Sequence, residues 1–449
     1  MATVAHEAVP AISHGQVTRD VVATLGKPSR AYVLMLLGAV AMFGIGAVTF
    51  VLLLKDGLGL AGYTPPVMWL VYITTFVFWV GIGHAGTLIS AILFLFRSPW
   101  RTAVYRATEA MTVFAIMTAA LFPIIHIGRQ WIFYWLLPYP NQRYLWPNFK
   151  SPLLWDVFAI STYLTVSTTF LVVGLVPDIA AVRDQVSGWR KKLYAACSLG
   201  WTGSDNQWRH YTRAYLYLAA LATPLVLSVH SVVSWDFAMS IIPGWHGTIF
   251  APYFVAGAIY SGIGMVLTLL IPLRRLLKVE HLIHGYHFDN LAKLTLLTGT
   301  ILAYAYAMEY FVAWYSGVKW EQTTFYLRAF GPQWWAGWSM IICNAFVSQL
   351  LWFRKIRGNL TALFVISIFI NIGMWFERYV IIASSLSNDF LPWNWAVPNP
   401  TWADWGILVG SFGWFLMYFL LFARTFPIVA IQEIKETIPM PRKRAGGHH

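Results

Sequence analysis

The residues of this sequence best suited to chemistry are a histidine and an aspartate that flank one aromatic loop between two apolar stretches. Pro123 is expected to break a helix just before His126, Arg129 follows His126 after three residues, and Asp156 opens the next apolar stretch. A spacing of three places His126 and Arg129 on one helix face. Histidine and aspartate accept protons well when burial tunes them. The pattern predicts that His126 and Asp156 remove protons from a bound molecule.

Other ionisable residues also fall inside apolar stretches or at their edges, where each costs roughly 2.5–3.5 kcal/mol in a membrane helix. His230 and Asp236 lie near the end of a later stretch and are further candidates for the same site. A structural alternative for the remaining group is an ion pair of Arg378 with Glu309 or Glu377, although the neighbours Glu377 and Arg378 project about 100° apart on a helix. The functional interpretation is a proton pathway at graded depths, made of His84, Glu109, Glu309, Glu377 and Arg378.

The composition places these residues in a membrane. Of the 449 residues, 58% are hydrophobic and 11% charged, which is unlike a soluble domain. The net charge of +13 comes from basic residues in short loops, and these report membrane orientation and not a nucleic-acid partner. Cys197 and Cys343 form no CxxC or CxxCH motif, so we expect no haem, iron–sulfur cluster or metal bound by this chain. Electrons must therefore leave to a dissolved cofactor or a partner.

Ten apolar stretches are long enough to cross a bilayer, which takes roughly 20 residues per helix. They are residues 31–54, 67–96, 107–127, 152–175, 214–239, 251–273, 291–316, 333–353, 359–385 and 404–423. Of the 31 Lys and Arg residues, 24 fall on the side of the termini, six on the opposite side, and one, Arg378, inside a span. The positive-inside rule then predicts cytoplasmic tails, 1–30 and 424–449. The outer loops, 128–150 and 386–403, are aromatic, which is typical of the membrane interface and of a surface that docks an extracytoplasmic partner.

Weak internal similarity divides the spans into two units. Phe78–Gly86 resembles Phe254–Gly262, and Ser151–Asp156 resembles Gly331–Ala336. Because each unit has four spans, the copies share one orientation, and the small residues of the second and sixth spans permit close helix contact. We expect an all-α polytopic membrane protein with ten transmembrane helices, in which 67–239 and 251–385 form two four-helix bundles (spans 2–5 and 6–9), flanked by 31–54 and 404–423.

The two units differ in chemistry. Asp156 of the first unit has Ala336 as its counterpart, and His84 has Tyr260. A functional site is therefore expected in the first unit.

Six segments together resemble the polysulfide-reductase/NrfD-like family of integral membrane subunits. These are Gly81–Ala91, Glu109–Thr112, Pro123 with His126–Arg129, Ser151–Asp156, His230–Asp236 and Phe376–Arg378. The resemblance covers all ten spans and is strongest to the ActC-type quinol-oxidising subunits of bacterial alternative complex III. It implies a ten-helix fold in the bacterial cytoplasmic (inner) membrane, with a quinol site on the outer side beside an iron–sulfur protein. The pocket histidine and aspartate of that family correspond to His126 and Asp156, and Asp236 to a third member.

The residues and the resemblance together predict a subunit of a respiratory or photosynthetic complex that oxidises quinol, foremost menaquinol, with proton translocation as an accompanying role. His126 and Asp156 are the expected catalytic residues, and Arg129, His230 and Asp236 complete the expected quinol site. The expected partners are the lipid bilayer, an extracytoplasmic iron–sulfur subunit, further membrane subunits and cytochrome c subunits. Two alternatives are the quinone-reactive anchor of a molybdopterin oxidoreductase and, less favoured by repeats of equal orientation, a proton-coupled transporter.

Overall fold

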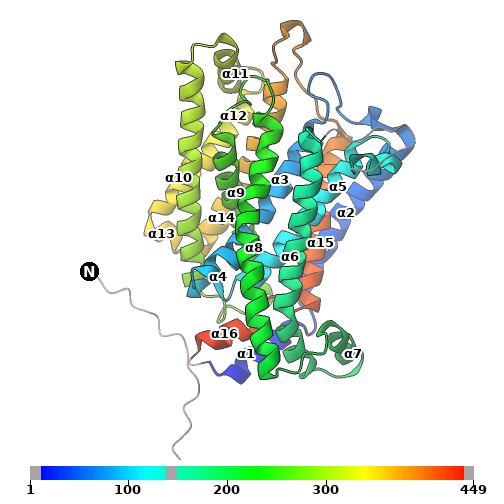
Figure 1. The fold of residues 1–449 in the computed structure, drawn as a ribbon, viewed down its shortest axis with the longest axis vertical. Helices are drawn as coiled ribbons and strands as arrows, with labels where there is room; N and C mark the ends of the chain where they lie inside the picture. Colours follow the sequence, from blue (N-terminus) through cyan, green and yellow to red (C-terminus); the bar gives the residue numbers. More distant parts are fainter. Residues whose placement is uncertain (1–11, 138–148, 439–449) are drawn as a thin grey trace, which may run out of the picture.

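The computed structural model describes residues 12–137 and 149–438, and in these ranges the chain forms helices and no strands. Nine helices are long and apolar enough to cross a membrane, and each coincides with a predicted span (Figure 1). They are α2 (Arg30–Asp56), α3 (Leu70–Thr87, continued by a π-helical turn and α4 to Leu95), α5 (Tyr105–His126), α6 (Pro152–Arg183), α8 (Asp205–Ala238), α9 (Phe250–Leu276), α10 (Gly285–Tyr315), α14 (Leu360–Tyr379, continued by a π-helical turn to Ser384) and α15 (Trp402–Thr425). The prediction of an all-α, multi-pass membrane protein is confirmed.

The predicted span 333–353 is helical but irregular. It consists of α12 (Trp334–Ile341), a π-helical turn (Ile342–Phe346) and a 3₁₀ segment (Val347–Trp352). The backbone carbonyl of Asn344 accepts hydrogen bonds from the hydroxyls of Tyr260, at 3.2 Å, and Ser348, at 2.7 Å. Side chains thus satisfy a backbone group that the irregular turn leaves available, as backbone inside a membrane requires.

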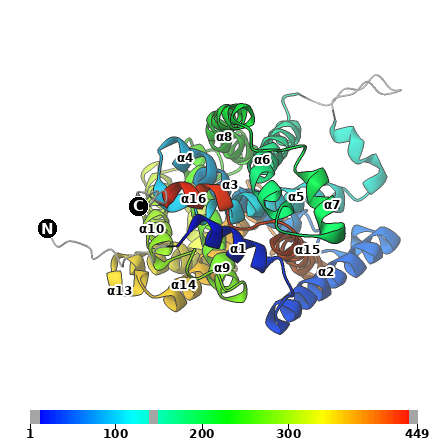
Figure 2. The same ribbon diagram turned by 90° about the horizontal axis from the view of Figure 1, so that it is seen from below.

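Short helices gather at one end of the molecule, called here the terminal face (Figures 1 and 2). They are α1 (His14–Thr24), α7 (Gly188–Cys197) and α16 (Ile431–Thr437). The guanidinium group of Arg424 donates to the carbonyls of Thr24 and Gly26. The chain therefore enters its first long helix and leaves its last one at the same end. The opposite end, the distal face, carries α11 (Lys319–Phe330) (Figure 1).

Small residues set the closest helix contacts. A Cβ atom added at Gly46 of α2 would lie 2.4 Å from the Cα of Gly410 on α15, so these two backbones touch. On α9, a Cβ added at Gly262 would lie 2.4 Å from the Cβ of Ala85 on α3. Without water to drive association, such backbone approach is how membrane helices gain packing energy.

The long helices contact one another in two groups. In the first, α3 packs on α5, α5 on α6, and α6 on α8, while in the second α9 packs on α10 and α14, and α14 on α12. The groups meet mainly where α3 and α8 contact α9, and α2 and α15 pack together beside the first group. A division into two four-helix bundles would produce these contacts, and the division itself stays a prediction.

The sidedness of the membrane is a prediction that the fold makes easy to test. Because the basic loops lie at the terminal face, a reporter enzyme fused after His449 should be active only in the cytoplasm, and one inserted near Asn399 only outside. Paired cytoplasmic and extracytoplasmic reporters at the two positions supply the measurement. An extracytoplasmic signal from the fusion after His449 would reverse every assignment of inner and outer side.

Candidate functional site

Two carboxyl groups meet near the distal face. Asp156 lies in the first turns of α6 and Asp236 in the last turn of the neighbouring, antiparallel α8. Their carboxyl groups are close enough to share a hydrogen bond, which requires one proton between them, because two ionised carboxylates at this distance repel. Asp156 is 6% exposed. The Oδ1 atom of each aspartate is buried without a hydrogen-bond partner in the described ranges, so this acid pair retains unused acceptors.

Aromatic rings and a histidine accompany the acid pair at this face. Trp155 and Trp235, the chain neighbours of the two aspartates, contact each other edge to face at 6.3 Å between ring centroids. The ring of His126, the last residue of α5, lies edge-on to Trp69 at 6.0 Å. Its Nδ1 atom is buried and has no hydrogen-bond partner within residues 12–137 and 149–438. His126 is therefore a second free proton acceptor near the distal face.

Two sequence expectations about this region need correction. Pro123 does not break α5 before His126, because the helix continues through both residues. A proline removes one backbone donor but does not prevent the remaining bonds of a last turn. Arg129 lies beyond the helix end with its side chain exposed, so the helical spacing that paired it with His126 does not apply.

The structure places His230 beside His84, in the interior, although the sequence grouped it with Asp236. The two imidazole rings are 4.5 Å apart between centroids, and both side chains are fully buried. The Nδ1 atom of His84 lies 2.7 Å from the carbonyl of Val80, so it carries the proton and leaves Nε2 as a free acceptor. Neither ring nitrogen of His230 has a hydrogen-bond partner in the described part of the chain.

An ion pair lies next to these histidines. Arg378 Nη1 is 2.6 Å from Glu377 Oε1, so of the two predicted partners the structure selects Glu377. The long arginine side chain closes the angle between neighbouring positions, and its guanidinium group also stacks 4.6 Å from the centre of the Phe254 ring. Tyr306 donates to the other oxygen of Glu377 and accepts from Asn344 at 2.9 Å. This set is called the central cluster.

The remaining predicted acid of that region, Glu309, stays outside the central cluster. Its Oε1 atom is buried without a hydrogen-bond partner among the described residues. Glu309 is therefore free to hold a proton, unlike Glu377, whose two oxygens are both engaged.

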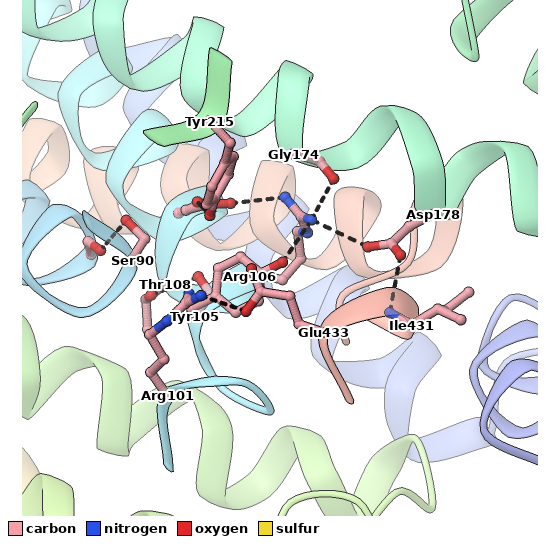
Figure 3. Close-up of polar contacts among 12 residues, drawn as sticks. Ser90, Arg101, Tyr105, Arg106, Thr108, Gly174, Asp178, Tyr215, Ile431 and Glu433 are labelled. Atoms are coloured by element: carbon pink, nitrogen blue, oxygen red, sulfur yellow. Dashed lines mark hydrogen bonds and ion pairs between the residues drawn. The ribbon is translucent and has the colours of Figure 1, made fainter. Parts of the chain in front are cut away.

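Towards the terminal face, Arg106 joins two acids in a terminal cluster (Figure 3). Its guanidinium group lies 2.9 Å from Glu109 Oε2 and 3.2 Å from Asp178 Oδ2. It also donates to the carbonyl of Gly174 at 2.6 Å, and Tyr215 donates to Glu109 Oε1 at 3.2 Å. All three charged side chains are at most 3% exposed. Removing one partner of such a pair costs about 3–5 kcal/mol.

The helix α16 closes the outer side of the terminal cluster (Figure 3). Asp178 Oδ1 accepts the backbone N–H groups of Ile431, at 3.1 Å, and Gln432, at 3.0 Å. Arg101 lies 2.6 Å from Glu433. Burial lowers the pKa of Arg101, but the carboxylate of Glu433 and nearby tyrosines outweigh burial and raise it above its usual value. The ion pair therefore persists at every physiological pH.

A small polar cavity separates the terminal cluster from His84. It is lined by Thr87, Ser90, Glu109, Thr112 and Ser167, and its free volume of about 10 Å³ is close to what one water molecule needs. On the far side, Thr87 hydrogen-bonds Tyr163 at 2.7 Å, and the Tyr163 ring lies 5.0 Å from that of His84. Polar groups therefore follow one another from His84 to Glu109.

The sequence reasoning missed Arg106 and Asp178. It ended the fourth span at residue 175 and began the third at 107, which left both residues outside the membrane. The helix α6 instead continues to Arg183. The spacing of Arg106 and Glu109, three residues apart on one helix, was a signal for their pairing.

Comparison with known proteins gives two findings. The family described as polysulphide reductase, NrfD, matches residues 59–387. A protein of Halobacterium salinarum, described as a dimethyl sulfoxide reductase membrane protein, is 28% identical over 257 residues, or 56% of this chain. The match covers 54% of that relative, so the chain spans about half the length of the relative.

Proposed function

The chain belongs to the NrfD polysulphide reductase family, and from this premise we propose that it is the subunit through which a membrane oxidoreductase exchanges electrons with quinol. The observation that carries the proposal is the acid pair, Asp156 with Asp236. Its unused buried oxygens lie beside Trp155 and Trp235 near one face. Carboxyl acceptors and flat apolar walls fit the polar edge and the ring of a quinol.

Oxidation of a quinol releases two protons and two electrons, and the distal face offers an acceptor for each proton. The acid pair holds one proton and one negative charge, so it takes up one more proton before it is neutral. His126 Nδ1, which has no partner in the described ranges, takes the other. The two electrons pass to an iron–sulfur centre of a partner subunit, because Cys197 and Cys343 are the only cysteines of the chain.

The parent complex is proposed to be a molybdopterin oxidoreductase. The similarity to a dimethyl sulfoxide reductase membrane protein supports this parent. The motif resemblance around His126 and Asp156 favours a second parent, alternative complex III. The location of both chain ends of the helical core at the terminal face requires an even number of crossings, so we also propose that the irregular segment 334–352 is the tenth span.

The parent complexes differ in their cofactors. Purification of the native complex from its membrane should yield a molybdopterin-containing subunit together with iron–sulfur protein. Metal analysis and the visible spectrum of the same preparation supply the measurement. Covalently bound c-type haem without molybdenum would replace the first parent by alternative complex III.

The proposed chemistry makes a specific mutational prediction. Asp156→Asn and Asp236→Asn should each lower quinol oxidation by roughly 10²-fold, the effect of losing a positioned acid–base group. The double variant should be little worse than either single variant, because the two aspartates act as one unit. His126→Ala should cause a loss of similar size. Turnover is measured with a soluble quinol in the purified complex.

The control for this prediction is Asp389→Asn, a half-buried aspartate of the distal loops, which should keep normal turnover. Assembly of every variant is checked by subunit composition. Near-normal turnover in assembled Asp156→Asn and His126→Ala complexes would exclude the proposed site.

Proton transfer through the interior is a separate proposal. We place Glu309, Glu377 and Arg378 with His84 and Glu109 on a route that links the central cluster to the terminal face through the one-water cavity. Glu109→Gln, Glu309→Gln and Glu377→Gln should each reduce proton translocation per electron while leaving quinol binding intact. Proton release from vesicles, measured with a pH dye during turnover, supplies the ratio, and Glu280→Gln at the terminal face serves as control.

Loss of assembly in Glu377→Gln would have a different meaning. A buried ion pair that loses one partner is destabilised by about 3–5 kcal/mol, so such a result would assign Glu377 to holding Arg378. Glu377→Asp, which keeps the charge, separates the cases. An assembled Glu377→Asp complex with an unchanged proton ratio would remove Glu377 from the route.

A further inference from the structure

A second cavity lies near the distal face, on elements that do not contribute to the acid pair. It is formed where α11 leads into α12 and where the end of α14 meets the loop before α15, and it encloses about 180 Å³. Its apolar walls include Leu327, Pro332 and Trp395, and its polar lining includes Gln333, Ser387 and Asn388. The Trp395 ring is held in place because its Nε1 atom donates to the carbonyl of Asp389 at 2.8 Å.

One lining residue has an unused acceptor. Gln333 is 5% exposed, and its Nε2 atom donates to Ser387 Oγ at 3.4 Å. Ser387 gives its own hydroxyl proton to the carbonyl of Ala383 at 2.6 Å, so it can only accept from Gln333, which fixes the amide orientation. Gln333 Oε1 is then buried with no partner in the described part of the chain. An acceptor left in this state costs about 1–3 kcal/mol, which a hydroxyl-bearing ligand recovers.

The size and charge of the cavity define the ligand class. A cavity of roughly 150 Å³ is large enough to hold benzene, so this one accommodates a single six-membered ring. Its lining residues, which also include Ser384, Ala396 and Val397, contain no titratable side chain. The cavity therefore binds a neutral ring through its hydroxyl group but offers no residue that removes the proton.

We propose that this cavity is a second quinol site, which holds the quinol ring through Gln333 Oε1 without oxidising it. The inference rests on the proposed function, because a quinol is the hydroxyl-bearing ring that such a subunit handles. The predicted internal repeat supports it: Pro332 and Ala336 correspond to Pro152 and Asp156. The second unit thus has an alanine where the first has its acid.

The test uses the intact purified complex in lipid nanodiscs, with 4-azidophenol as a photoreactive one-ring probe. Illumination should label the segment 384–397 as well as the segments around Asp156 and Asp236, as mapped by peptide mass spectrometry. Gln333→Leu should lower labelling of 384–397 by about tenfold, the effect of a lost hydrogen bond to a buried acceptor. Labelling around Asp156 and quinol turnover should not change. The matched control is Gln322→Leu, an exposed glutamine of α11, which should leave both labels intact.

A second variant protects the test against a folding failure of Gln333→Leu. Ala396→Trp fills the cavity from its wall and should also remove the label from 384–397. Equal labelling of 384–397 in the wild-type complex and in either assembled variant would overturn the second site. Labelling confined to the Asp156 and Asp236 segments would overturn it while leaving the proposed function standing. Labelling confined to 384–397 would support it and count against the acid pair as the quinol site.

Discussion

The cost of a charge inside a membrane organises this molecule. An ionisable side chain at the centre of a bilayer is stable only when it has a partner, reaches water or exchanges protons. The described helices bury Arg106, Glu109, Asp178, Glu377 and Arg378 almost completely. Each of these side chains lies in an ion pair. The acid pair of Asp156 and Asp236 is different, because no guanidinium group within the described ranges accompanies it. Its stability depends on a proton, and a proton is what quinol chemistry supplies.

The same constraint explains where the helices become irregular. Three π-helical turns interrupt the long helices of the described chain, at Leu88–Ile92, Ile342–Phe346 and Val380–Ser384. The first begins four residues after His84, the second contains Asn344, and the third begins two residues after Arg378. Such turns concentrate at functional sites because they redirect side chains and release backbone groups. All three adjoin residues of the interior polar groups, which indicates that the helices are distorted to bring those side chains together.

The sequence predicted the spans well and the contacts poorly, for a physical reason. A span is defined by the length of an apolar stretch, which the bilayer fixes, so the helix ends agree closely for α2, α5 and α15. A contact between helices depends on rotation and depth, which a stretch of apolar residues leaves undetermined. The sequence therefore grouped His230 with Asp236, six residues away on α8, whereas the fold brings His230 to His84 of α3. The pairing of Arg378 with its own neighbour was open from sequence because rotamers decide it.

The two proposed quinol sites near the distal face differ in the one property that separates binding from reaction. At Asp156 and Asp236, a bound hydroxyl meets groups that accept its proton, so loss of electrons is not opposed by a trapped positive charge. At Gln333, a hydroxyl meets an amide oxygen that accepts a hydrogen bond but no proton, so oxidation there would leave the protons without an acceptor. A single ring therefore reacts at the acid pair and is only held at Gln333. The difference follows from the side-chain chemistry at each position and requires no difference in the helices that hold them.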